Sequence, residues 1–245
     1  MSFLITTIVA GELYLNFAPV YIYSLKKSYP DYDIKIYSWD KIPKNIKEIL
    51  KDINCEDCLI EIDLPIAKTP NNIKASRFLY THDLKYNYIF VGDIDFFICP
   101  EIPSLLDHHL DFCNTHNLSY SNRVRSGTKR LTGLHFYKTA DYNVDVLKSF
   151  KNNFENIQSH CGDEELLYQI INKMGFEFPK KIIGERLQHG IHIKRRYGKD
   201  LSAKEKEYSN IFKNAYNNDN VFKNILNRLS KQARSYINDC YRRLS

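Results

Sequence analysis

Residues 88–98 read Tyr-Ile-Phe-Val-Gly-Asp-Ile-Asp-Phe-Phe-Ile: two carboxylates, one residue apart, lie between two apolar runs. The residues before Asp93 are too few for a helix and rich in β-formers, which predicts a buried strand that ends near Gly92. Alternate residues of an extended chain point to the same side, so Asp93 and Asp95 share a face at the end of this strand. Mg²⁺ and Mn²⁺ prefer oxygen ligands, so the pair predicts a divalent-metal site, although an ordinary acidic turn has the same short pattern.

Composition predicts a folded α/β protein with one large domain and a possible small extension. The chain has 245 residues, of which 43% are hydrophobic, with 18 Tyr and 14 Phe. No apolar run is long enough for a transmembrane helix, and the first ten residues read as a core strand rather than a signal peptide. Six cysteines without a dense pattern fit a reducing, cytoplasmic location. Cys55 and Cys58 form a lone C-x-x-C, for which a zinc or redox role is a minor alternative.

Strand and helix patterns alternate along the first two thirds of the chain with short connections. This alternation is typical of a mostly parallel sheet covered by helices, and ligands of such sheets bind at the carboxyl ends of the strands. Asp93 and Asp95 lie at such an end. The expected strands are 3–9, 33–39, 58–64, the run from Tyr88 to about Gly92, and 131–137. The expected helices are 14–27, 43–52, 73–83, a short helix after Pro103, 141–154 and one that starts near Cys161.

The charge is divided unevenly between the two parts of the chain. Residues 180–245 carry sixteen basic and six acidic residues, whereas residues 1–179 have a net charge of −4. A basic C-terminal part indicates an anionic partner: a phosphate, a membrane surface or a nucleic acid. Apolar residues from Val221 to Leu244 recur with the helical period, which predicts one amphipathic helix. That helix either packs on the domain or lies in an anionic membrane interface.

Several short motifs follow one another in a recognisable order. They are Lys74-Ala-Ser-Arg77, the Asp93–Asp95 strand, Leu131-Thr-Gly-Leu-His135, Gly162-Asp-Glu-Glu-Leu-Leu167 and His189-Gly-Ile-His192. Together they resemble a GT-A glycosyltransferase, most similar to the family 8 galactosyl- and glucosyltransferases of lipopolysaccharide synthesis, with features of family 6. The resemblance covers about residues 3–196. It implies a Rossmann-like GT-A catalytic domain over residues 1–200, followed by a basic helical tail over residues 201–245.

The resemblance also implies a reaction. A hexose would move from a nucleotide sugar, of the UDP type, to a bacterial surface glycan or lipid-linked glycan, with retention of configuration and with Mn²⁺ or Mg²⁺. The implied metal ligands are Asp93, Asp95 and His189, with His192 as the substitute for His189. Asp163 would bind the donor sugar, and Glu164 would be the nucleophile or the main stabiliser of positive charge. The implied donor-binding residues are Thr7, Tyr14, Lys74, Arg77, Asp93, Lys194 and Arg195.

The sequence departs from the family 8 pattern at three places. Val9-Ala-Gly-Glu-Leu-Tyr14 keeps only the tyrosine of the usual base-binding stretch, which leaves the nucleotide open. No Pro-Trp pair follows Lys194. Family 8 commonly has Gln after the acid that matches Asp163, whereas this chain has Glu164, as family 6 does.

Two other classes of function compete with glycosyl transfer. Phosphatases and phosphotransferases with an Asp-x-Asp nucleophile usually have Thr two residues after the second acid, where this chain has Phe97. A basic adaptor could bind nucleic acid through residues 180–245, but the aromatic residues there follow a core period, so no nucleic acid is expected. The basic tail leads us to expect a cytoplasmic enzyme on the inner face of the cell membrane.

Overall fold

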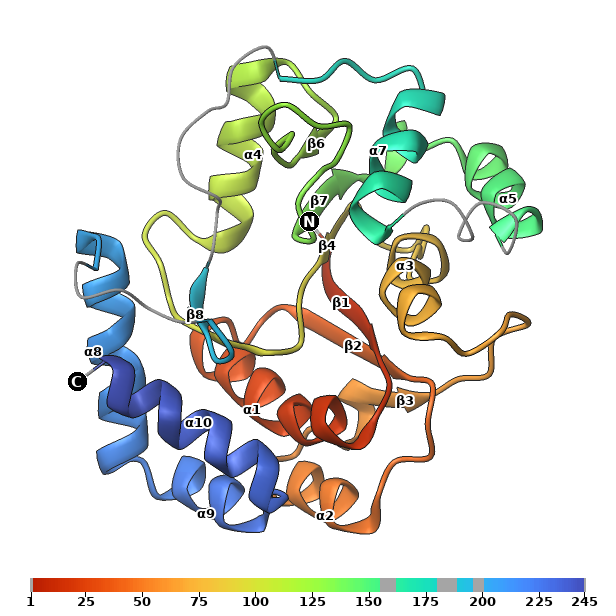
Figure 1. The fold of residues 1–245 in the computed structure, drawn as a ribbon. Coiled ribbons are helices and arrows are strands. Elements are labelled where there is room, and N and C mark those ends of the chain that lie inside the picture. The colour runs from red at the N-terminus through yellow and green to blue at the C-terminus, as the bar shows by residue number, and fades with distance from the viewer. Residues whose placement is uncertain (1, 155–161, 180–188, 196–200, 245) are drawn as a thin grey trace.

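A computed structural model describes residues 2–154, 162–179, 189–195 and 201–244. Its main sheet has the strand order β3-β2-β1-β4-β7-β6 (Figure 1). The first four strands in this order are parallel, while β7 runs antiparallel to β4 and β6 antiparallel to β7. A separate antiparallel pair joins β5 and β8. The strands are β1 (Phe3–Val9), β2 (Asp33–Ser38), β3 (Leu59–Glu61), β4 (Tyr88–Val91), β5 (Phe96–Ile98), β6 (Tyr120–Ser121), β7 (His135–Lys138) and β8 (Gly190–His192).

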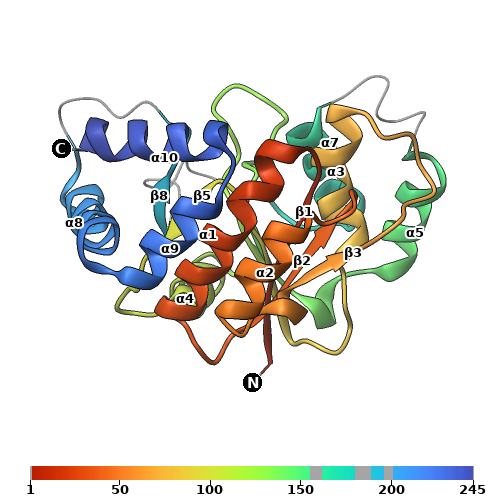
Figure 2. The same ribbon diagram turned by 90° about the horizontal axis from the view of Figure 1, so that it is seen from below.

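The helices cover both faces of the main sheet, as Figure 2 shows from below. Helices α1 and α2 pack on one face together with the C-terminal helices, and α3, α5 and α7 pack on the other. This mixed, mostly parallel architecture confirms the predicted α/β fold class. The helices are α1 (Glu12–Ser28), α2 (Lys44–Asp52), α3 (Pro70–Tyr80), α4 (Leu105–His116), α5 (Val144–Asn152), α7 (Asp163–Lys173), α8 (Ala203–Asn218), α9 (Asn220–Arg228) and α10 (Lys231–Leu244), with short 3₁₀ turns at Glu56–Cys58 and Thr139–Asp141.

Strand β1 is the centre of the core, because both of its faces are covered. All seven of its residues are buried. Phe3 and Ile5 belong to the cluster under α1, whereas Leu4 belongs to the cluster under α3, as the alternation of side chains along a strand requires. Strand β4 pairs with β1 in parallel register from Phe3 opposite Tyr88 to Thr6 opposite Val91. The acids that follow β4 therefore emerge beside the end of β1, at the carboxyl edge of the sheet.

The C-terminal segment differs from the single helix that its sequence predicts. It forms two helices, α9 and α10, because Leu229 is extended and the backbone N–H of Ser230 donates to the side-chain oxygen of Asn16 at 2.8 Å. Helices α9 and α10 lie beside α1 (Figures 1 and 2). Their apolar side chains, Phe222, Ile225, Ile237 and others, are buried in the same core cluster as those of α1. These apolar side chains cannot therefore also lie in a membrane interface while the segment stays packed. The predicted domain boundary at residue 200 stays a prediction, since residues 196–200 lie outside the described part of the chain.

Three smaller differences concern element ends. The strand expected over 58–64 is confined to β3, and that expected over 131–137 begins only at His135. The third difference is β6, which lies in the polar segment 114–129, outside the expected strands. Among the described helices, none combines the length and hydrophobicity that crossing a bilayer requires.

Candidate active site

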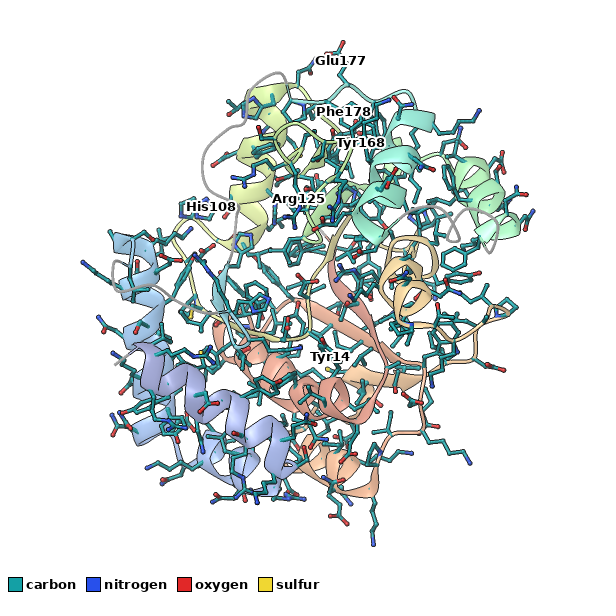
Figure 3. The ribbon with its side chains drawn as sticks, viewed as in Figure 1. Tyr14, His108, Arg125, Tyr168, Glu177 and Phe178 are labelled. Atoms are coloured by element: carbon teal, nitrogen blue, oxygen red, sulfur yellow. The ribbon has the colours of Figure 1, made fainter. Side chains whose placement is uncertain are left out.

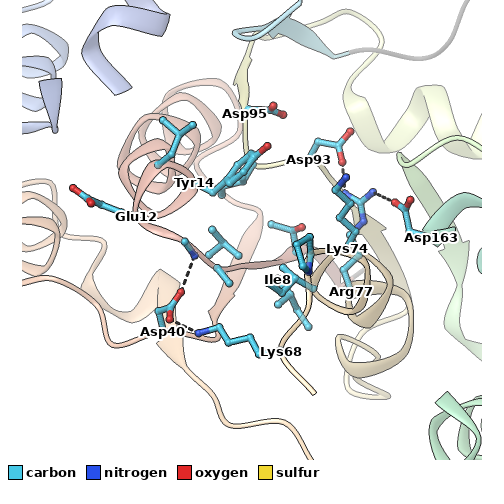
Figure 4. Close-up of a pocket in the computed structure, with 18 of the residues that line it drawn as sticks. Ile8, Glu12, Tyr14, Asp40, Lys68, Lys74, Arg77, Asp93, Asp95 and Asp163 are labelled. Atoms are coloured by element: carbon cyan, nitrogen blue, oxygen red, sulfur yellow. Dashed lines mark hydrogen bonds and ion pairs between the residues drawn. The ribbon is translucent and has the colours of Figure 1, made fainter. Parts of the chain in front are cut away.

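A cavity of about 1000 Å³ opens at the carboxyl edge of the main sheet, beside the ends of β1 and β4. Its walls come from the β1–α1 turn, the first turns of α3, the acids after β4 and the first turn of α7 (Figure 4). Among the predicted site residues, those that line it are Thr7, Tyr14, Lys74, Arg77, Asp93, Asp95, Asp163, Glu164 and His192. Residues far apart in the sequence thus meet at the edge where parallel sheets bind their ligands.

Helix α3 supplies two cations to this cavity. The helix begins with Pro70 at its first turn and with the Thr69 hydroxyl accepting the backbone N–H of Asn72, which fixes the start of the helix. Lys74 and Arg77 are three residues apart and therefore lie on one face of the helix. Lys74 is exposed, whereas Arg77 is buried at the base of the cavity.

Arg77 joins two of the predicted acids. One guanidinium nitrogen, Nη1, pairs with Asp93, and Nη2 lies 3.2 Å from Oδ2 of Asp163 (Figure 4). Burial alone would lower the pKa of Arg77, but the two carboxylates outweigh it and raise that pKa. A Cβ atom at Gly133 would lie 2.7 Å from Nη2 of Arg77, so a larger residue there would push the guanidinium out of its present place. Gly133 is thus a point of close approach between the backbone and Arg77.

Asp95 lies in a different environment from Asp93. It is 9% exposed, and Nε2 of His192 lies 3.7 Å from its Oδ1. Burial raises the pKa of Asp95; nearby Asp93 adds to this effect, while His192 and Lys194 oppose it. The β5–β8 pairing brings His192 to this place, because Phe96 is opposite His192 and the N–H of Ile193 donates to the carbonyl of Asp95 at 2.8 Å.

His189 does not lie with the two acids, which corrects its expected place in the metal site. Its Nδ1 is 2.6 Å from Glu101, its Nε2 is 3.0 Å from Nε2 of His109, and it is buried behind the cavity. Successive side chains of an extended segment alternate in direction, so residues an odd number apart point to opposite sides. His189 and His192 are three apart, and only His192 faces Asp95.

The first turn of α7 carries the other two acids. Asp163 meets Arg77, as described above, and Glu164 pairs with Arg125 and with Arg130, the latter at 3.0 Å. These arginines come from a hairpin-like loop that is closed by the N–H of Arg125 donating to the carbonyl of Arg130 at 2.8 Å. The pairing of Glu164 with Arg125 joins segments that are distant in sequence. That pairing spans 39 residues of sequence for Arg125 and follows from no local pattern.

Lys194 and Arg195 lie outside the residues that line the cavity. The Lys194 ammonium donates to the Tyr14 hydroxyl at 2.7 Å and lies 4.6 Å from the centre of that ring and 5.7 Å from that of Tyr236 on α10. Arg195 pairs with Glu205 on α8 at 2.7 Å. Lys194 thus lies beside the cavity, next to the lining residue Tyr14, and its ammonium has N–H groups besides the one that Tyr14 accepts.

Asp40, Lys68 and Gln232 are among the cavity residues that the sequence did not suggest. Asp40, just after β2, accepts the N–H of Gly11 at 2.7 Å and pairs with Lys68 (Figure 4). Gln232 of α10 lies at the rim. The position of Asp40 at the carboxyl end of a predicted parallel strand is a signal that could have revealed it.

The donor set suits a divalent cation that is shared with a ligand. Among the residues that the structure describes, no three His, Cys, Asp or Glu side chains converge on one point. Mg²⁺ and related ions are commonly bound by only one or two carboxylates together with phosphate oxygens of a substrate. The carboxylate oxygens of Asp93 and Asp95, with His192 beside them, meet that requirement.

Comparisons with known proteins find neither a matching protein-family model nor a matching curated protein. Solved structures with a similar arrangement include a galactosyltransferase, LgtC, in complex with donor and acceptor sugar analogues (11% identity, TM-score 0.44, 68% of this chain and 69% of that one). Others are the glycosyltransferase GlyE of Streptococcus pneumoniae TIGR4 (13%, 0.47, 71% and 44%) and a putative nucleotide-diphospho-sugar transferase from Desulfovibrio desulfuricans G20 (8%, 0.46, 100% and 97%). At these identities and TM-scores the similarities do not assign a function to this chain.

Proposed function

We propose that this chain transfers a sugar, a hexose, from a nucleotide-sugar donor of the UDP type to a glycan, with Mn²⁺ or Mg²⁺ bound at Asp93 and Asp95. The observation that carries the proposal is the composition of the cavity. A pair of acids suited to a cation lies next to Lys74 and Arg77, and a second pair of acids follows at the start of α7. The first group suits a diphosphate with its metal ion, and the second suits the hydroxyls of a sugar.

Cleavage of a nucleotide sugar releases a nucleoside diphosphate, so negative charge grows on the leaving group. When bound, a divalent cation stabilises that charge as a Lewis acid. The cations of this chain add to it: Lys74 from α3, and Lys194, which lies beside the cavity and has N–H groups for a phosphate oxygen besides the one donated to Tyr14. Such preorganised charge is commonly the largest contribution to catalysis. Arg77 holds Asp93 and Asp163 in fixed places, and the free lone pairs of Asp163 can accept sugar hydroxyls.

Glu164 is proposed as a stabiliser of positive charge on the sugar rather than as a nucleophile. A retaining transferase either forms a covalent glycosyl-enzyme or lets the acceptor enter on the side of the leaving group. Arg125 and Arg130 both pair with Glu164, and two cations reduce the nucleophilicity of a carboxylate. Its remaining negative charge can still stabilise an oxocarbenium-like state. In the same way, the pairing of Asp93 with Arg77 disfavours a phosphatase mechanism in which Asp93 is the nucleophile.

The acceptor is proposed to be a bacterial surface glycan or a lipid-linked glycan, handled in the cytoplasm at the inner face of the membrane. Since the apolar side of α9 and α10 is packed on the domain, contact with anionic lipid would have to use exposed basic side chains such as Lys223, Lys231 and Arg242. Such contacts are worth about 1 kcal/mol per residue and are screened by salt.

The decisive experiment is a screen of nucleotide sugars with Mn²⁺ that measures released nucleoside diphosphate. One donor should be hydrolysed slowly without an acceptor, and this activity should be lost in EDTA and in Asp95→Asn. Asp111→Asn, which changes an exposed aspartate of α4 outside the cavity, is the matched control and should keep full activity. Turnover that persists undiminished in EDTA would contradict the metal-dependent mechanism, and a product of inverted configuration would contradict retention.

A further inference from the structure

A second cavity, of about 530 Å³, follows the outer face of α7. Five residues of that helix line it, at positions 165, 168, 169, 172 and 173, and this spacing places them in one stripe along the helix. The opposite side of α7, with Leu166 and Ile170, is buried in the core. Phe150 of α5 and Lys129 of the arginine-bearing loop form the other walls. We call this cavity the α7 groove; its helical residues are Glu165, Tyr168, Gln169, Asn172 and Lys173.

The α7 groove and the active-site cavity lie on either side of the first turn of α7. Glu164 lines the active-site cavity, and its neighbour Glu165 lines the groove. The same division occurs in the loop, where Arg130 lines the first cavity and Lys129 the second. Consecutive residues of a helix point about 100° apart. The first turn of α7 is therefore the partition between the two cavities, and a chain-like ligand could pass from one into the other along the helix.

The side chains of the α7 groove combine an aromatic surface with uncommitted amides. Tyr168 is stacked on Phe178, with ring centroids 4.2 Å apart and planes inclined by 7°, so its ring has a fixed orientation (Figure 3). Gln169 and Asn172 make no side-chain hydrogen bond within the described residues, and both have donor and acceptor atoms to offer. Hydroxyl groups likewise both donate and accept, and the carbon-bound hydrogens of a sugar ring pack well on an aromatic surface.

The charge and length of the groove narrow the choice of ligand. The lining contains one acidic residue, Glu165, and two basic residues, Lys129 and Lys173. This net positive charge is too small to bind a nucleic-acid backbone. The stripe is too polar to receive the apolar face of a helix. It spans eight residue steps, about 12 Å along the helix axis, which is longer than a single sugar ring.

We infer that the α7 groove binds the part of an acceptor oligosaccharide that lies beyond the sugar unit to be extended. This inference rests on the proposed glycosyl transfer. The terminal unit of the acceptor would lie at the active-site cavity beside Asp163 and Glu164, and the preceding units would run along α7 over Tyr168, Gln169 and Asn172. The groove would then select for acceptors of sufficient length, without touching the donor.

Binding of the full-length protein to a printed array of mono- to hexasaccharides, in EDTA and without donor, tests the inference. The double variant Gln169→Ala, Asn172→Ala changes only partly or fully exposed side chains, and Asn210→Ala, an exposed asparagine of α8 outside the groove, is the matched control. The wild-type protein should bind oligosaccharides of three or more units better than their shorter fragments. Loss of two hydrogen bonds should weaken binding of the longer glycans by about tenfold and leave the fragments unaffected.

A second measurement, donor hydrolysis without acceptor, separates this inference from the proposed reaction. It should be equal in the double variant, the control and the wild type. If no nucleotide sugar is hydrolysed but the array result is as expected, the proposal of glycosyl transfer is contradicted, whereas the inference that the α7 groove binds a glycan is supported. The inference is overturned if the wild-type protein binds no glycan on the array, or if the double variant binds long glycans as tightly as the control does.

Discussion

Replacement of Arg77 by glutamine should destabilise the protein strongly, since it leaves Asp93 and Asp163 facing each other without their shared cation. Removal of one partner from a buried ion pair costs about 3–5 kcal/mol. The Arg77 side chain is 10% exposed, whereas the side chains of Asp93 and Asp163 are 20% and 21% exposed. Water therefore screens part of the charge left on the two carboxylates, and the lower end of the range of about 3–5 kcal/mol applies. We expect about 3 kcal/mol. For a chain of this size each kcal/mol lowers Tm by about 2–4 °C, so Tm should fall by about 6–12 °C.

Urea unfolding followed by far-UV circular dichroism, together with thermal scans, measures this effect. Arg125→Gln is the control: it also removes a guanidinium from an acid of α7, but the Arg125 side chain is 46% exposed, so the expected loss is below about 1 kcal/mol. A triple variant that adds Asp93→Asn and Asp163→Asn should regain most of the lost stability, because no unpaired charge remains. Equal losses in Arg77→Gln and Arg125→Gln, or no recovery in the triple variant, would refute the reasoning.

Three further predictions follow from the same structure. Burial raises the pKa of Asp95, so its charged form destabilises the fold at neutral pH. Asp95→Asn should therefore raise the free energy of unfolding at pH 7, and this gain should fade as the pH falls toward 3.8 and the wild-type carboxyl becomes protonated. Urea unfolding at several pH values measures the gain, and a gain that is unchanged at low pH would contradict the prediction. Ile237→Ala, at a fully buried position of α10, should lower the free energy of unfolding by about 2–4 kcal/mol. The control, Lys231→Ala at an exposed position of the same helix, should lower it by less than about 0.5 kcal/mol. Equal urea midpoints for the two variants would show that α10 does not pack as described. His192→Gln should raise the Mn²⁺ concentration for half-maximal donor hydrolysis about tenfold with little loss of stability. His189→Gln should mainly lower Tm, because His189 contacts Glu101 and not the two acids. The opposite pattern would show that His189, and not His192, binds the metal ion.

The prediction of the sheet succeeded where the pattern was local. The strand before Asp93 was recognised because four β-forming residues precede a glycine, and the structure has β4 there. The single C-terminal helix failed at Ser230, where a local and a distant contact combine: the Ser230 hydroxyl accepts the N–H of Ala233 at 3.4 Å as a helix cap, and a second contact comes from elsewhere in the chain. The side chain of Asn16 takes the N–H of Ser230 and so separates α9 from α10. No pattern within residues 221–244 records that partner, which is 214 residues away.

The sequence by itself determined that two carboxylates follow a buried strand at the carboxyl edge of the sheet, because a short β-forming run that ends at a glycine is a local pattern. Both acids line the cavity, although Asp95 lies in a turn and not on the strand, so the alternation expected for an extended chain does not hold there. The sequence also determined the α/β class, since short strands alternating with amphipathic helices bury their apolar faces in few other ways. Only the tertiary structure decided that His192 rather than His189 meets Asp95, that Glu164 meets two arginines, and that the tail packs on α1. Each of these depends on the register of strands or loops that are distant in sequence, and such a register is set by the packing of the whole chain.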